Sequence, residues 1–208
     1  MRIILILLCL SANFVFGQTD LGSWSSVSAL WQSSEKLSLK LRPIVRHNMD
    51  LSSYANSSID FSLAYKINSQ WTVLLLERHW FIPEAGDREF LFFDVKHQAK
   101  LSSKLNLQNR LRWHLALDIS GVDEDYIRYE PTFKFKTNSK FTPFVAADFF
   151  IAIGSDRTSN RVRYVLGTGY KISEHIGINF QFWHQSGITD LDFPKDYILV
   201  LDLAYRID

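Results

Sequence analysis

The chain has 208 residues, of which 47% are hydrophobic, 14% aromatic and 22% charged. This composition excludes a disordered chain, and the length fits a single domain. The formal net charge is +1, from 23 basic and 22 acidic residues. A balance so close to neutral argues against a nucleic-acid-binding protein, which needs an excess of positive charge to attract the phosphate backbone.

Residues 1–17 have the pattern of a secretory signal peptide. The apolar run from Ile3 to Phe16 is shorter than the about 20 residues that a membrane-spanning helix needs. Cleavage after Gly17 is therefore favoured over an N-terminal membrane anchor. The single cysteine, Cys9, lies within this segment, so residues 18–208 are expected to form one domain without disulfides or thiol chemistry.

Five short polar turns recur along the rest of the chain, with centres near residues 34, 69, 103, 138 and 174. A period near 34 is also that of helical tetratricopeptide repeats, but the flanking residues alternate with period two, not 3.6. The alternating runs are about 10 to 15 residues long, whereas strands of soluble proteins average about 5–6. The pattern predicts strands at residues 21–31, 36–48, 57–66, 71–82, 89–101, 105–119, 125–136, 141–153, 160–171, 176–187 and 196–207.

This alternation fits a soluble barrel with an apolar core or a membrane barrel with the opposite polarity. Three features favour the membrane barrel. The strands reach the about 10 residues that cross a bilayer, and tight turns alternate with longer loops. Aromatic residues also gather near strand ends, as in an interfacial girdle: Trp31, Trp71, Trp80, Phe81 and Phe141.

We therefore expect an all-β protein, an antiparallel up-and-down transmembrane β-barrel of about 10–12 strands, in the bacterial outer membrane. Short turns would face the periplasm and longer loops the outside, and the partner would be outer-membrane lipid. A soluble periplasmic barrel that binds an apolar ligand is the alternative. Oligomeric state cannot be read from these residues.

The predicted strands number eleven, whereas bacterial single-chain barrels have an even number. Segment 21–31 alternates least clearly and is rich in serine. We therefore expect a ten-strand barrel with this segment as a partial strand, or a twelve-strand barrel with one strand hidden.

The two ends of the predicted barrel differ in charge, because the tight turns are rich in lysine and the longer loops in aspartate and glutamate. The acidic loops either keep the exposed end soluble or hold divalent cations beside anionic lipid headgroups.

The parity of each strand assigns its side chains to the lumen or to lipid. The charged residues expected to line the lumen are Lys40, Arg42, Asp60, Asp94, Arg110, Arg112, Asp118, Arg128, Glu130, Lys134, Asp148, Arg161, Arg163, Asp202 and Arg206. The residues expected to face lipid are Leu107, Leu111, Trp113, Leu115, Leu199, Leu201 and Leu203.

The charged lumen has two interpretations. Its side chains either pair across strands and fill a narrow barrel, or they line a selective pore for small polar solutes. A barrel of about ten strands leaves little free interior, which favours the first. If water fills the lumen, Leu111→Arg is predicted to be more damaging than Arg112→Leu.

No sequence motif for catalysis or metal binding is present, so no catalytic residue, metal site or cofactor is predicted. An enzyme that modifies outer-membrane lipid is the alternative. Three histidines lie near predicted loop ends, with serine and acidic residues close by in the sequence: His47, His79, His184, Ser52, Ser53, Glu84 and Ser186.

Several short segments resemble one uncharacterised bacterial family. They are the start at Leu21-Gly22-Ser23-Trp24, the hairpin strand 36–42, the strand 110–113, and Arg161-Val162-Arg163-Tyr164 followed by 166–171. The family is that of predicted outer-membrane β-barrels called domain of unknown function twenty-four-ninety. The resemblance spans nearly all of residues 18–208. It implies a fold and a location, and no activity.

Overall fold

The computed structural model describes residues 21–47, 51, 53–84, 86–117, 125–153, 160–188 and 196–207. The predicted signal peptide lies outside these residues. Within them, no helix is long and apolar enough to cross a membrane. The described strands are β1 (Leu21–Gln32), β2 (Leu37–His47), β3 (Tyr54–Lys66), β4 (Trp71–Ile82), β5 (Gly86–Lys100), β6 (Leu105–Ala116), β7 (Tyr126–Phe135), β8 (Phe141–Ala152), β9 (Arg161–Lys171), β10 (Ile176–Gly187) and β11 (Asp196–Ile207).

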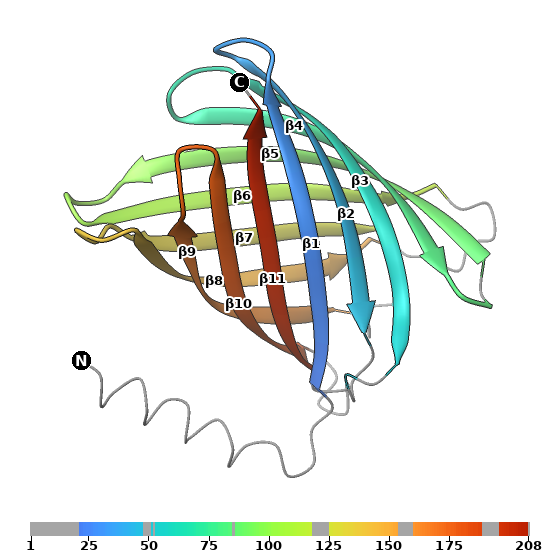
Figure 1. Ribbon diagram of the computed structural model, residues 1–208. Coiled ribbons are helices and arrows are strands. Elements are labelled where there is room, and N and C mark those ends of the chain that lie inside the picture. Colours follow the sequence, from blue (N-terminus) through green and yellow to red (C-terminus); the bar gives the residue numbers. More distant parts are fainter. Residues whose placement is uncertain are drawn as a thin grey trace, which may run out of the picture.

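These strands form one closed barrel in which each strand pairs with its neighbours in sequence and β1 pairs with β11. Figure 1 shows β1, in blue, beside β11, in red. The β1–β11 pair is parallel, and the other pairs are antiparallel. The predicted all-β up-and-down barrel of about 10–12 strands is therefore confirmed, with one parallel ladder at the closure.

The expectation of an even strand number is wrong. Segment 21–31 is a full strand that pairs with β2 on one side and with β11 on the other, from Leu21↔Tyr197 to Trp31↔Ile207. A serine-rich strand alternates weakly in hydrophobicity, but its backbone donors and acceptors still complete two ladders. The closure needs this eleventh strand, because the barrel would otherwise have open edges.

The five polar turns close the hairpins at one end of the barrel, hereafter the turn end. In each turn a short polar side chain accepts a hydrogen bond from the backbone N–H two residues ahead, and in three of the turns it also accepts one from the residue three ahead. Asn68 Oδ1 accepts from the backbone N–H of Gln70 and Trp71, at 2.9 Å each. Ser34 and Ser173 make the same contacts. The period near 34 is thus the length of a hairpin plus its turn and loop.

The two faces of the barrel differ in the way that the alternation predicted. Of the 36 exposed large hydrophobic side chains among the described residues, 29 belong to the strands, where they cover the outer face. The inner face is mixed: Asp60, Asp94 and Asp148 are among its fully buried side chains, and so is Phe92. Phe90, Phe92 and Leu76 form a small apolar cluster on the inner side of β4 and β5. The lumen is therefore polar along part of its wall and apolar along the rest.

Candidate functional site

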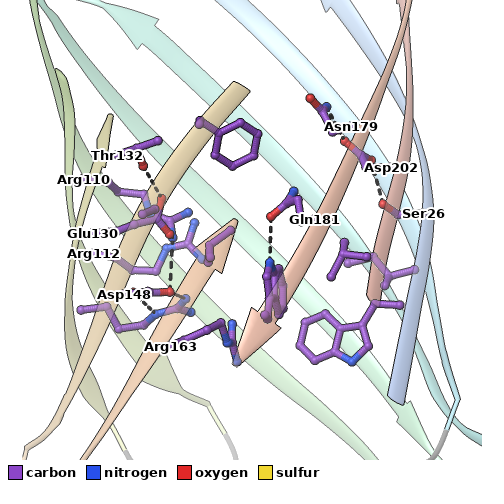
Figure 2. Close-up of a pocket in the computed structure, with 18 of the residues that line it drawn as sticks. Ser26, Arg110, Arg112, Glu130, Thr132, Asp148, Arg163, Asn179, Gln181 and Asp202 are labelled. Carbon is purple, nitrogen blue, oxygen red and sulfur yellow. Dashed lines mark hydrogen bonds and ion pairs between the residues drawn. The ribbon is translucent and has the colours of Figure 1, made fainter. Parts of the chain in front are cut away.

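The candidate site is a cavity of about 490 Å³ inside the barrel. Nine basic and three acidic side chains line it, together with tryptophan and phenylalanine rings. Figure 2 shows charged residues of β6, β7, β8 and β9 on one side and polar residues of β1, β10 and β11 on the other. The lining of the cavity is thus strongly cationic in composition. The binding properties of the cavity depend on which of these cations are paired with a carboxylate.

Asp94 and Arg112 form the most deeply buried ion pair of the described residues. Asp94 is 0% exposed, and its two oxygens accept hydrogen bonds from Arg112 Nε at 2.5 Å and Nη2 at 2.7 Å. The Arg112 guanidinium also lies over the ring of Phe92, at 4.8 Å from the centroid. A bidentate pair of this kind fixes both side chains in place.

Asp60 is a single carboxylate shared by two arginines. Arg42 Nη2 donates to Oδ2 at 2.6 Å, and Arg78 donates from Nε to Oδ1 at 2.6 Å and from Nη2 to Oδ2 at 2.9 Å. The three residues lie opposite one another on β2, β3 and β4, because Asp60 is the register partner of both arginines. The group carries a net positive charge.

A second shared carboxylate is Asp148. It accepts a hydrogen bond from Arg128, and Arg110 Nη2 lies 3.7 Å away. Arg110 pairs more closely with Glu130, at 2.5 Å (Figure 2). These four residues form a continuous ion-pair network along β6, β7 and β8, in which every charge has an opposite charge beside it.

The opposite wall is neutral apart from one carboxylate. Ser26 Oγ donates to Asp202 Oδ1 at 2.7 Å, and Asn179 Nδ2 contacts Oδ2 at 3.4 Å. Trp183 Nε1 donates to Gln181 Oε1 at 2.8 Å (Figure 2). Both of these hydrogen-bond partners of Asp202 are uncharged side chains.

Toward the loop end of the lumen, three arginines have neutral partners. Arg46 donates to Asn56 Oδ1 at 2.8 Å and to Ser58 Oγ at 3.2 Å. Arg163 donates to Gln185 Oε1 at 2.8 Å, and Arg161 to the hydroxyl of Tyr126 at 3.2 Å. Their planar groups stack on the inward rings Trp24, Trp80, Trp183, Phe150 and Tyr126.

A second cavity, of about 440 Å³, lies at the turn end. It shares Thr142, Gly169 and Asn179 with the lumen cavity, so the two are contiguous along their walls. Lys140 and Arg206 are among the residues that line it. The lumen cavity thus continues toward the turn end of the barrel.

Most of the predicted lumen residues lie around the central cavity. Asp60 and Asp94 lie behind its wall, paired with cavity arginines. Lys40 is half-buried on the same face of β2 as Arg42. Arg206 is exposed and lines the second cavity, and Asp118 lies outside the described residues. Those that line the central cavity are Arg42, Arg110, Arg112, Arg128, Glu130, Lys134, Asp148, Arg161, Arg163 and Asp202.

The residues predicted to face lipid all lie on the outer face. Leu111, Trp113, Leu201 and Leu203 are exposed, whereas the remaining three are half-buried: Leu107, Leu115 and Leu199.

The prediction that Trp80 belongs to the aromatic girdle is wrong. Trp80 points into the lumen, where Nε1 donates to Asn56 Oδ1 at 2.6 Å and the ring stacks on Arg46. Its even number puts it on the inner face of β4, with Arg78. Trp31, Trp71, Phe81 and Phe141 are exposed on the outer face.

Sequence reasoning missed several cavity residues: Arg46, Arg78, Trp24, Trp80 and Trp183. Parity would have found both arginines, since Arg46 shares a face with Arg42, and Arg78 stands opposite Asp60. The inward tryptophans were missed because a large ring near a strand end resembles a girdle residue, and only parity distinguishes the two.

The three rim histidines do not assemble a catalytic relay in the described part of the barrel. His47 contacts Ser23 at 3.4 Å, and His79 lies 3.2 Å from Asp87. The ring of His184 stacks between Tyr164 and Tyr197. No histidine among them has both a serine and a carboxylate partner, and Ser52 lies outside the described residues.

Among the described residues, no three His, Cys, Asp or Glu side chains lie close enough together to hold a metal ion. The groups that line the cavity include guanidinium groups, carboxylates and aromatic rings. Such groups bind and orient polar solutes through charge-assisted hydrogen bonds and cation–π contacts.

No curated protein matches the chain. A family model described as "Protein of unknown function (DUF2490)" matches residues 21–190, which includes every described strand except β11. The chain belongs to this family.

Proposed function

We propose that this protein spans the bacterial outer membrane and that its lumen is a narrow pathway for small polar solutes. The observation that supports the proposal is the polarity of the barrel: 29 large hydrophobic side chains of the described strands are exposed, while arginine and aspartate are buried inside. Soluble monomers rarely expose contiguous apolar patches larger than a few hundred Å². An apolar outer band around a polar interior is typical of outer-membrane barrels.

The exposed aromatic residues at the two ends of the barrel also support the proposal that it spans a bilayer. Trp31, Trp71 and Phe141 are exposed next to tight turns, and Phe81 and Tyr164 are exposed near the loop end. Amphipathic rings at both ends of an apolar band favour the two headgroup regions.

The pathway is supported by the two contiguous cavities, of about 490 and 440 Å³. Phe144 of β8 lines the larger cavity, two residues after Thr142, which lines both. Its ring lies over Gly167 so closely that a Cβ at that glycine would be 2.4 Å from Phe144 Cζ. A side chain at this position would therefore require the Phe144 ring to move.

The first test places a nitroxide spin label on each face of β6. A label at Leu111→Cys is expected to be accessible to oxygen dissolved in lipid and shielded from a water-soluble nickel complex. A label at Gln108→Cys, which faces the cavity, is expected to show no lipid contact. The protein would be reconstituted in phosphatidylethanolamine–phosphatidylglycerol vesicles.

Recovery of the protein in the soluble fraction without detergent would overturn the proposal, as would a label at 111 without lipid contact. Either result would favour the soluble barrel with an apolar ligand. Gln108 is chosen instead of Arg112 because its loss removes one hydrogen bond, from Lys134, and no ion pair.

The second test measures conductance in planar bilayers of diphytanoyl phosphatidylcholine. The protein is expected to give small discrete steps, and Phe144→Ala larger ones, because the substitution removes an aromatic ring from the wall of the lumen cavity. Phe149→Ala is the matched control, since the same truncation on the outer face of β8 leaves the lumen unchanged. Absence of steps from both the unchanged protein and Phe144→Ala would contradict the pathway and favour a filled structural barrel.

A further inference from the structure

Three arginines near the loop end of the lumen form no ion pair with a described carboxylate: Arg46, Arg161 and Arg163. Arg46 is 3% exposed and Arg163 is 9% exposed. A buried charge is costly unless an opposite charge or several hydrogen bonds compensate for its lost hydration. These three cations therefore differ from the arginines of the Asp60, Asp94 and Asp148 groups, each of which lies within 4 Å of a carboxylate oxygen. Arg163 stands opposite Asp148 across β8 and β9, but that carboxylate is paired with Arg128 and not with Arg163.

Neutral acceptors hold these guanidinium groups without cancelling their charge. Arg46 is bound by an amide and a hydroxyl oxygen, Arg163 by the amide oxygen of Gln185, and Arg161 by the hydroxyl of Tyr126. Such partners fix position and orientation. They leave a positive field in the cavity, strengthened by the low dielectric around it.

Two aromatic rings join the three arginines into one cluster. Trp24 lies 4.5 Å from the guanidinium carbon of Arg46 and 5.5 Å from that of Arg163, measured to its centroid. Phe150 lies 5.0 Å from Arg163 and 4.4 Å from Arg161. The cations thus surround a shared part of the lumen on β1, β2, β8 and β9.

This part of the lumen has free space, and its guanidinium groups have hydrogen-bond donors without a partner. All three arginines line the cavity of about 490 Å³, a volume in the range of small-molecule sites, about 300–1,000 Å³. The Nε atoms of Arg46, Arg161 and Arg163 are buried and have no hydrogen-bond partner. The nearest carboxylate network, around Asp148, is already engaged by Arg128 and Arg110.

We propose that Arg46, Arg161 and Arg163, with the rings of Trp24 and Phe150, form a binding site for a small oxyanion, a solute that carries a phosphate or carboxylate group. The oxyanion supplies the negative charge that the neutral partners lack, and guanidinium groups suit phosphate and carboxylate geometry. The proposal deepens the proposed function, since it makes the solutes of the pathway anions, and it rests on the lumen being open to small solutes.

The test is isothermal titration of inorganic phosphate, and separately of citrate, into the purified protein in detergent at constant ionic strength. Saturable binding at one site is expected. Arg163→Gln is expected to weaken it at least about tenfold, because a charge-assisted hydrogen bond is lost. Arg163→Lys keeps the charge and loses the planar donor pair. Its affinity is expected to lie between that of the unchanged protein and that of Arg163→Gln.

Lys134→Gln is the matched control, because it removes one positive charge from the same cavity but outside the cluster, where Lys134 bonds Gln108. It is expected to change the affinity less than about twofold, the residue being beyond direct contact with the bound anion. An equal loss in Lys134→Gln and Arg163→Gln would overturn the site, and so would no binding by the unchanged protein.

Folding of each variant is checked by circular dichroism. If Arg163→Gln does not fold, Arg161→Gln replaces it, since Arg161 is half-buried and has one hydrogen bond. Phosphate binding unchanged by Arg161→Gln would then overturn the proposal. The titration does not depend on conduction. A protein that conducts in bilayers but binds no phosphate or citrate refutes the site alone, and one that binds them without conducting refutes the pathway alone.

Discussion

Replacing Arg112 by leucine is expected to lower the free energy of unfolding by about 3–5 kcal/mol, because it leaves a buried carboxylate without its partner. Asp94 is 0% exposed, and both of its oxygens accept hydrogen bonds from Arg112. Urea unfolding of the barrel in detergent, followed by tryptophan fluorescence, measures the effect.

The double variant Asp94→Leu with Arg112→Leu separates the cost of an unpaired charge from the loss of the pair. Replacing a whole buried ion pair by apolar side chains is often neutral or stabilising. The double variant is therefore expected to recover most of the stability that Arg112→Leu loses. If Arg112→Leu cost less than about 1 kcal/mol, the value of an exposed pair, water would have to reach Asp94.

A cost of about 3–5 kcal/mol for Arg112→Leu would reverse the order that a water-filled lumen predicts, in which Leu111→Arg is the more damaging of the two substitutions. Leu111→Arg, on the outer face, is expected to cost about 2–4 kcal/mol near the bilayer midplane. The inward substitution is now expected to be at least as damaging, because the structure shows the lumen to be closed around Asp94.

The faces of the strands could be predicted from the sequence because side chains alternate with period two in any strand. The inner position of Arg110 and the outer position of Leu111 follow from parity alone, whatever surrounds the barrel. For the same reason, alternation could not show how dry the interior is. That depends on packing, such as the stacking of Phe92 on Arg112.

The ion pairs across the tight turns could also have been predicted. A symmetrical hairpin pairs residues that are equidistant from the centre of its turn. Asp94 and Arg112 are equidistant from residue 103, and Asp60 and Arg78 from residue 69. The pairing of Asp60 with Arg42 could not be predicted in this way, because a longer loop joins β2 to β3, and its length does not fix the register.

The parallel closure could not be predicted from β1 itself. A strand presents the same donors and acceptors to a parallel or an antiparallel neighbour, with a different slant of the hydrogen bonds. Whether β1 meets β11 is decided by how the eleven strands curve and close together. The usual even number of strands in bacterial barrels therefore misled the sequence interpretation.

Replacing Asp60 by leucine is expected to destabilise the barrel by about 3–5 kcal/mol, as for other broken buried ion pairs. Asp60 is 2% exposed and binds Arg42 and Arg78 through three hydrogen bonds. Without the carboxylate, the guanidinium groups of Arg42 and Arg78, on the strands either side of β3, repel each other with no counter-charge between them. The same urea unfolding experiment measures the loss.

Two variants of the same strand show whether charge or shape is responsible. Asp60→Asn keeps the side-chain shape and one acceptor oxygen, so its cost is expected to lie well below that of Asp60→Leu. Ser62→Ala alters the next inward residue of β3, which is 5% exposed and uncharged, and is expected to cost less than about 1 kcal/mol. If Asp60→Leu were as mild as Ser62→Ala, the two arginines would have to be hydrated, and the lumen would be wider and wetter at this level than the contacts around Asp60 imply.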